Sequence, residues 1–198
     1  MSEQTVCIID DDAGVRESLH ELLDAAGYRP EVFARAADFL ASETLSRCAC
    51  LITDIRMPEM DGLALQEELN RKQHRLPVIV ITGHGDVPLA VRAMKAGASD
   101  FIEKPFKHET LLAAVERALA PMPPVALDAS VTRRIGSLTE REREVLDLMV
   151  LGHPNKMIAQ KLDISFRTVE VHRARVLAKM QAANVAELVR LMMGAGHT

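Results

Sequence analysis

Short apolar runs alternate with longer amphipathic segments along the first 120 residues. The apolar runs predict strands, and they cover Val6–Asp10, Arg29–Phe33, Ala49–Asp54, Val78–Thr82 and Asp100–Glu103. The segments between and after them have apolar residues at helical spacing, at Val15–Gly27, Ala36–Ser42, Leu63–Lys72, Val87–Ala96 and His108–Ala120. Five such pairs predict a doubly wound, five-stranded parallel sheet with helices on both faces. The nearly continuous apolar runs CIID and VIVIT are typical of strands covered on both sides.

The pattern changes after residue 120. Residues 121–137 begin with three prolines in four positions and have no clear periodicity, so they predict a linker. Residues 138–198 contain no strand pattern and predict an all-α domain of four helices. The first of these opens at Thr139, an N-cap residue whose capping-box partner is Glu142. The others are predicted at residues 155–163, 165–180 and 184–193.

Composition and charge support two modules. The chain has 198 residues, of which 48% are hydrophobic and 26% charged, as expected for a globular protein. The net charge of −4 is uneven, because residues 1–120 hold 13 Lys and Arg against 20 Asp and Glu, whereas residues 121–198 hold 11 against 8. A basic second module after an acidic first one suggests a nucleic-acid binder.

The expected location is the cytoplasm, with no membrane partner. No apolar run approaches the roughly 18 residues that a membrane span requires, and the N-terminus lacks the pattern of an export signal. The three cysteines, Cys7, Cys48 and Cys50, lie in strand-like stretches, where reduced core thiols are the favoured interpretation. A metal site at Cys48 and Cys50 is disfavoured because no second Cys or His pair completes it.

Polar residues stand at the ends of four predicted strands. The first strand ends in Asp10-Asp11-Asp12, the third ends in Asp54, the fourth ends in Thr82, and the fifth leads to Lys104. Parallel strands bring these ends to one edge of the sheet, where ligands bind in open α/β folds. Clustered carboxylates favour a hard cation such as Mg²⁺, and the lysine and hydroxyl suit a phosphoryl group. Asp54 is then the candidate nucleophile, forming an acyl phosphate.

Two other interpretations compete at this site. Aspartates after strands are most often turn or capping residues, although the full set in this order is hard to obtain by chance. A phosphatase or phosphotransferase on a similar sheet also forms an aspartyl phosphate. Such enzymes usually place a second Asp two residues after the nucleophile as general acid and base, and this chain has Arg56 there. We therefore expect self-phosphorylation and slow hydrolysis, not turnover of outside substrates.

Residues 155–180 predict a helix, a turn at Asp163–Ser165 and a second helix. The second helix has an apolar face and a basic face, and the basic face carries Arg167, His172, Arg173, Arg175 and Lys179. An amphipathic basic helix after such a turn fits a DNA major groove, with basic side chains reaching phosphates. An ordinary solvated face is the alternative.

Four features together indicate a known family: the motifs VCIIDDD, LITDIRMPEMDG and VIVITGHGDVPLAVRAMKAGASDFIEKPF, and the helical C-terminus. The chain resembles bacterial two-component response regulators of the FixJ type, which join a flavodoxin-like receiver domain to a LuxR-type helix-turn-helix domain. The resemblance covers nearly the whole chain. It implies a phosphorylation-switched transcription factor that is not an enzyme on other substrates, although the receiver assists its own phosphorylation and dephosphorylation.

The resemblance also assigns roles in the receiver. Asp54 matches the phosphoacceptor, and the family's Mg²⁺ ligands fall on Asp10, Asp11, Asp54 and the backbone carbonyl of Arg56. Thr82 matches the switch hydroxyl, Lys104 the phosphate-contacting lysine and Phe101 the switch aromatic. Asp12 matches no family role, and we expect it to N-cap the first helix. In this family, the positions of Arg56 and His84 face the phosphoryl group and tune the lifetime of the acyl phosphate. An equally favoured alternative is that both are simply solvent-facing loop residues.

In LuxR-type domains the second helix of the motif reads DNA. Matched by position to this family, Glu170, Val171 and Ala174 would face base edges. Glu can accept from a cytosine amino group, and Val can pack on a thymine methyl. The remaining expected DNA contacts are Lys156, Arg167, Thr168, His172, Arg173 and Lys179. In the last helix, an apolar stripe of Val185, Leu188, Val189 and Met192 implies dimerisation, with packing inside the domain as the alternative.

The implied partners are a sensor histidine kinase, double-stranded promoter DNA, RNA polymerase and, on phosphorylation, a second copy of the chain. Pairing would use the face made by residues 87–96 and the fifth strand. Two other classes stay open: a constitutive DNA-binding protein with a relic receiver, and a phosphate sink in a relay. The intact set of site residues opposes the first, and the DNA-binding module opposes the second.

Overall fold

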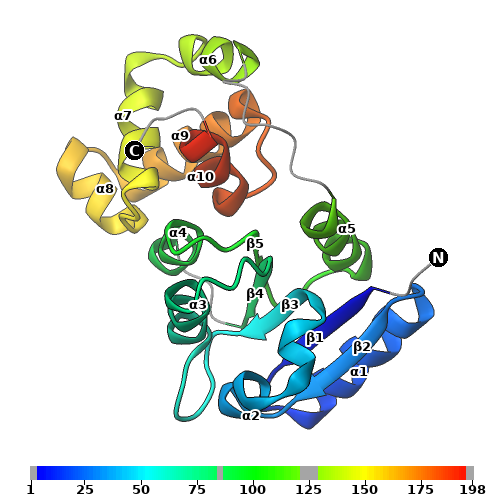
Figure 1. Cartoon of the computed structure of the whole chain (residues 1–198). Coiled ribbons are helices and arrows are strands. Elements are labelled where there is room, and N and C mark those ends of the chain that lie inside the picture. Colours follow the sequence, from blue (N-terminus) through cyan, green and yellow to red (C-terminus); the bar gives the residue numbers. More distant parts are fainter. Residues whose placement is uncertain (1–3, 84–86, 121–128, 195–198) are drawn as a thin grey trace. The chain divides into compact units, whose positions relative to one another are not determined.

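The structure is a computed structural model that describes residues 4–83, 87–120 and 129–194. Its contacts divide the chain into two compact units, residues 1–85 with 95–121, and residues 86–94 with 122–198 (Figure 1). The short stretch grouped with the second unit corresponds to helix α4 (Val87–Lys95). Within the described residues, no helix has both the length and the apolar character needed to cross a bilayer.

The first unit is built on a parallel sheet of five strands in the order β2-β1-β3-β4-β5. The strands are β1 (Thr5–Ile9), β2 (Arg29–Phe33), β3 (Cys48–Asp54), β4 (Val78–Thr82) and β5 (Asp100–Glu103). Every residue of β1 and β4 is buried, because helices cover both faces of the sheet. The predicted doubly wound α/β fold is confirmed, with each strand within a residue of its expected bounds.

Helices follow β1, β2, β3 and β5 within this unit. They are α1 (Ala13–Ala25), α2 (Ala36–Ala41), the 3₁₀ turn η1 (Glu43–Ser46), α3 (Gly62–Arg71) and α5 (His108–Leu119). Leu19 and Leu23 of α1 and Leu111 and Val115 of α5 pack in one core cluster with alternate residues of the sheet. Figure 1 shows α1 and α5 on one side of the sheet and α2 and α3 on the other.

Two of these helices begin at aspartate caps. The Asp12 side chain accepts hydrogen bonds from the N–H groups of Gly14 and Val15, which confirms its predicted N-cap role. Asp61 caps α3 in the same way, through the N–H of Ala64. Asp12 lies at the end of the loop after β1, and Asp61 lies at the end of the loop after β3. The two caps therefore fix where these loops end.

The second unit packs helices α6 (Ala129–Gly136), α7 (Glu140–Val150), α8 (Asn155–Leu162), α9 (Phe166–Met180) and α10 (Val185–Gly194). The last four match the predicted helices closely. Thr139 and Glu142 form the expected capping box at the start of α7. The buried residues of these helices, among them Val145, Met149 and Val176, form one hydrophobic cluster.

Helix α6 differs from the sequence prediction. It lies inside residues 121–137, which were expected to be a linker, and the first eight of those residues are outside the described part of the chain. Val131 and Ile135 stand one turn apart on α6 and are buried in the cluster of the second unit. The described residues 129–194 therefore form five helices, α6 to α10, and their packing starts before the predicted residue 138.

Candidate functional site

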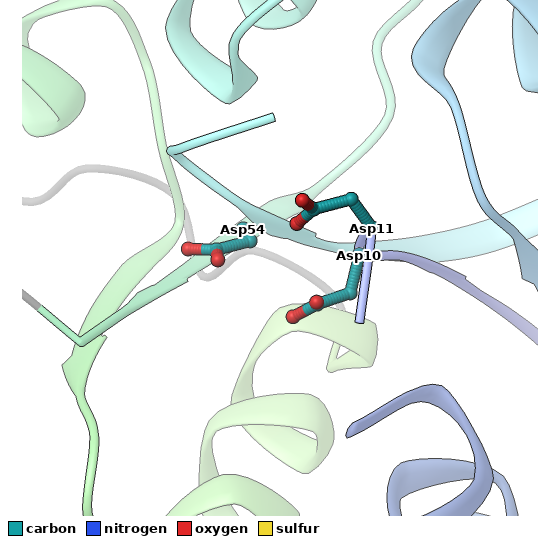
Figure 2. A group of neighbouring side chains, drawn as sticks. All are labelled: Asp10, Asp11 and Asp54. Carbon is teal, nitrogen blue, oxygen red and sulfur yellow. The ribbon is translucent and has the colours of Figure 1, made fainter. Parts of the chain in front are cut away.

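Three carboxylates meet at the carboxyl-terminal edge of the sheet. Asp10 follows β1, Asp11 is next to it, and Asp54 is the last residue of β3. One carboxylate oxygen from each lies within 4.8 Å of the others, and Figure 2 shows the three side chains side by side. Asp10 is buried, Asp54 is partly buried and Asp11 is exposed. The predicted acidic cluster is therefore formed, and it opens to solvent on the side of Asp11.

Strand pairing and backbone hydrogen bonds hold these carboxylates in place. Ile9 of β1 pairs with Thr53 of β3, so the two strands end beside each other. Asp10 Oδ1 accepts the N–H of Asp12 at 2.9 Å, and Asp54 Oδ1 accepts the N–H of Ile55 at 2.7 Å. Each of the two carboxylates keeps its other oxygen for a further partner.

Lys104 supplies that partner for both aspartates. Its Nζ lies 2.8 Å from Asp10 Oδ2 and 3.6 Å from Asp54 Oδ2. Burial raises the pKa of Asp54, the Lys104 charge opposes that rise, and the neighbouring Asp10 charge adds to it. The peptide bond between Lys104 and Pro105 is cis. A cation among carboxylates is the arrangement that a transferred phosphoryl group requires.

The other predicted receiver residues lie as follows. Thr82, at the end of β4, is buried, and its carbonyl accepts the N–H of Lys104 at 2.8 Å. Phe101 in β5 is also buried, 7% exposed. The Arg56 side chain is exposed. His84 lies outside the described residues.

Sequence reasoning missed two residues that shape this edge. The Arg16 guanidinium donates to the carbonyls of Asp10 at 2.7 Å and Asp11 at 3.0 Å, which fixes the loop that carries both carboxylates. Gly62 lies against Asp54, and a Cβ atom there would stand 2.3 Å from the Asp54 carbonyl oxygen. The sequence showed an Asp-Gly pair at the start of α3, but no side-chain pattern indicated that Arg16 would bind backbone carbonyls.

The donor set fits Mg²⁺. All the candidate ligands are oxygens: the carboxylates of Asp10, Asp11 and Asp54, and the predicted carbonyl of Arg56. A hard divalent cation takes such oxygen ligands and keeps water on its open side, here the side of exposed Asp11. When bound, Mg²⁺ would neutralise charge on the carboxylates and on phosphoryl oxygens.

The second unit contains the expected helix-turn-helix. Helix α8 ends at Leu162, and its C-cap residue Asp163 adopts a left-handed backbone conformation. The Ser165 side chain caps α9 through the N–H of Thr168. The Thr168 hydroxyl shares a 2.8 Å hydrogen bond with Ser165 and so belongs to the cap. The predicted turn at residues 163–165 is therefore confirmed.

One face of α9 is open to solvent. Glu170, Val171 and Ala174, the three predicted base-reading residues, are all exposed, as are Arg167 and Arg175. Val171 is 45% exposed. Lys156 is also exposed, on α8. The structure shows two further exposed apolar residues, Met157 next to Lys156 and Phe166 next to Arg167, which the sequence reasoning did not identify.

Two other predicted DNA contacts, Lys179 and Arg173, have partners inside the domain, and a third, His172, is only half-exposed. Lys179 Nζ lies 2.6 Å from Glu142 Oε2, and Arg173 donates to the Asn155 side chain. Burial lowers the pKa of Arg173. His172 is half-buried, and within the described residues its Nδ1 atom is buried without a hydrogen-bond partner. These contacts join helices of the domain and leave fewer basic groups for DNA.

The apolar stripe of α10 supports the packing interpretation. Leu188 and Met192 are buried in the hydrophobic cluster of the second unit, and Val185 packs against it while partly exposed. Val189 is also fully buried.

Comparisons with known proteins define the class. Residues 6–116 match the family model described as the response regulator receiver domain, and residues 136–192 match that of bacterial regulatory proteins of the luxR family. The acidic edge and the helix-turn-helix fall within these two matches. The chain therefore belongs to the response regulators that carry a luxR-type DNA-binding domain, and it acts in a two-component system as a transcription factor.

Individual relatives place it among FixJ-like regulators. The transcriptional regulatory protein FixJ of Bradyrhizobium diazoefficiens is 46% identical over 195 residues, which cover 96% of this chain and 95% of that protein. The response regulator protein TodT of Pseudomonas putida is 43% identical over 190 residues, 94% of this chain and 84% of TodT. A crystal structure of full-length FixJ from B. japonicum matches all of both chains with a TM-score of 0.55 and 43% identity.

Proposed function

We propose that Asp54 accepts a phosphoryl group from a sensor histidine kinase and that the modification controls binding to promoter DNA. The position of Asp54 carries this proposal. Its carboxylate lies within 4.8 Å of Asp10 and Asp11, and Lys104 Nζ stands 3.6 Å from one of its oxygens. A nucleophilic carboxylate beside a cation and a metal-binding pair suits in-line attack on phosphorus.

Phosphorylation would change the charges around Asp54. The added phosphoryl oxygens compete with Asp10 for Lys104, whose Nζ lies between the two carboxylates. Thr82 would donate its hydroxyl to the phosphoryl group. Phe101 is already buried here, so a switch that turns this ring inward would have to start from another conformation. Mg²⁺ held by Asp10, Asp11 and Asp54 would support the transfer.

The output would be paired DNA binding. Phosphorylated receivers would associate, and two helix-turn-helix domains would then meet a two-fold symmetric promoter site and act on transcription by RNA polymerase. The exposed residues of α9, Glu170, Val171 and Ala174, would contact bases. Lys156 and Arg167 would contact phosphates, since both side chains are exposed.

The test measures size and DNA binding together. Light scattering with Mg²⁺ and beryllofluoride, a phosphoryl mimic, is expected to show a dimer for wild type and none for Asp54→Ala. Fluorescence anisotropy with promoter-like DNA should show tighter binding of the same wild-type sample. A mimic-induced dimer in Asp54→Ala would refute Asp54 as the acceptor. Equal DNA affinity with and without the mimic would favour the constitutive DNA-binding protein instead.

A further inference from the structure

Phe166 is an aromatic residue on the surface of the second unit. Its side chain is 51% exposed, whereas the other four phenylalanines and Tyr28 are buried or partly buried. Single apolar residues are ordinary on protein surfaces, so exposure alone assigns no function to this ring. What distinguishes Phe166 is its place in the helix-turn-helix.

Phe166 is the first residue of α9, directly after the cap residue Ser165. Ser165 Oγ accepts the N–H of Thr168 at 3.0 Å and shares a 2.8 Å hydrogen bond with the Thr168 hydroxyl. The cap therefore fixes the start of α9, and the Cα–Cβ bond of Phe166 tilts toward this end of the helix. In helix-turn-helix domains, the N-terminal residues of the second helix contact base edges.

Phe166 lies in one row with two proposed base-reading residues. Phe166, Glu170 and Ala174 are spaced four residues apart, and all three are exposed. Residues four apart are neighbours on one side of a helix, so the three side chains form a continuous row. Val169 and Val176, by contrast, are fully buried and mark the side of α9 that faces the core. Phe166 therefore extends the base-reading row by one turn toward the start of α9.

The chemistry of the ring selects one feature of the DNA. Phenylalanine cannot exchange hydrogen bonds with the base edges. The apolar feature that the major groove presents is the C5-methyl group of thymine, and phenylalanine is among the side chains that contact it. Arg167, the next residue, is also exposed, so a positive charge for a nearby phosphate stands beside the ring.

We propose that Phe166 is a specificity-determining residue whose ring packs against a thymine methyl in the bound DNA. The thymine lies one turn of α9 beyond the bases that Glu170 and Ala174 face. This assignment rests on the proposed binding of promoter DNA through α9, and it names a base that the helix selects.

The test removes single methyl groups from the DNA. The full-length protein, with Mg²⁺ and beryllofluoride, first selects its preferred duplex from a random-sequence library. Each thymine of that duplex is then replaced singly by uracil, which lacks only the methyl group, and affinity is measured by fluorescence anisotropy. For wild type, uracil at one thymine of each half-site should weaken binding roughly 4-fold, the effect of burying about one methyl group.

Variants of Phe166 assign that thymine to the ring. Phe166→Ala and Phe166→Gln should bind the thymine and uracil duplexes equally at that position, and Phe166→Leu should keep part of the preference. A thymine that Val171 contacts should keep its preference in all three variants. Val32→Ala is the matched control, because Val32 is a comparably exposed apolar residue on β2, and it should behave as wild type.

The outcomes separate this role from a sequence-independent one and from the proposed function. The proposal is overturned if uracil never weakens binding of wild type, or if Phe166→Ala and Phe166→Gln keep every uracil penalty. Equal weakening of all duplexes by these variants is such a result, because it reports a sugar, phosphate or structural contact. A wild type that enriches no sequence would refute the proposed promoter binding, and the role of Phe166 with it.

Discussion

Replacing Lys179 by Met tests whether this lysine binds DNA or holds the domain together. Its Nζ lies 2.6 Å from Glu142 Oε2 and 3.1 Å from the carbonyl oxygen of Ser137. The same Glu142 oxygen accepts the N–H of Thr139 in the capping box. Met keeps the apolar stem of the side chain but leaves the buried Glu142 carboxylate with only its capping contact.

The magnitude follows from the charge on Glu142. Hydrogen bonds and nearby charge lower the pKa of Glu142 from an ordinary 4.5 to about 2, and the largest effect comes from the Lys179 hydrogen bond. At about 1.4 kcal/mol per pKa unit, all these contacts together contribute roughly 3 kcal/mol. The Lys179 side chain is 36% exposed, and solvent screening reduces its share, so we expect Lys179→Met to cost about 1–2 kcal/mol.

Amide hydrogen exchange in α7 and α9 measures that cost within the full chain. A loss of 1–2 kcal/mol should speed exchange by roughly 5- to 30-fold in these helices. The dependence of DNA affinity on salt concentration is expected to keep its slope, because no phosphate contact is lost. Lys156→Met is the matched control: exchange should not change, and the slope should fall by about 0.9.

The opposite result would refute the reasoning. If Lys179→Met lowers the salt slope by about 0.9 and leaves exchange unchanged, Lys179 contacts a phosphate and the ion pair with Glu142 is dispensable.

Three further predictions concern both units. Gly62→Ala should reduce phosphorylation of Asp54 by acetyl phosphate, measured by intact mass, because a Cβ would stand 2.3 Å from the Asp54 carbonyl oxygen; Gly136→Ala, with open space at its Cβ, should not. Arg16→Met should weaken Mg²⁺ binding about 10-fold in calorimetry by freeing the Asp10–Asp11 loop, and an unchanged affinity would contradict this role. Because the pKa of Glu142 is lowered in the folded state, its stabilisation is complete above pH 4.5 and lost as pH falls toward about 2. Exchange in α7 should rise over that range in wild type, and a Glu142→Gln variant should lack the change.

Strong local patterns made most of the fold predictable. Continuous apolar runs such as Val78–Thr82 predict buried strands, and the order of strands and helices limits the topology to few choices. Caps were equally local: Asp12 and the Thr139–Glu142 box act within three residues of themselves. The site followed because parallel strands end at one edge, which joins Asp10 to Asp54.

What the sequence did not predict depends on contacts between distant residues. Helix α6 is short, and Val131 and Ile135 have a partner surface only once the other helices of the unit are packed. Lys179 lies on the basic face of α9 by periodicity, yet Glu142 lies within its reach from 37 residues away in the chain. Arg16 acts on backbone carbonyls, which no pattern of side chains indicates.

The ion pair between Lys104 and Asp10 joins residues that are 94 positions apart. During synthesis, a ribosome-bound chain that ends before Lys104 therefore has the aspartates of the site but not this lysine. Domains generally fold as units from the N-terminus as the chain emerges. A nascent receiver thus becomes complete only with its last strand and helix, before α8 and α9 have been translated. On the proposed function, competence to receive a phosphoryl group would precede competence to bind DNA in the life of each molecule.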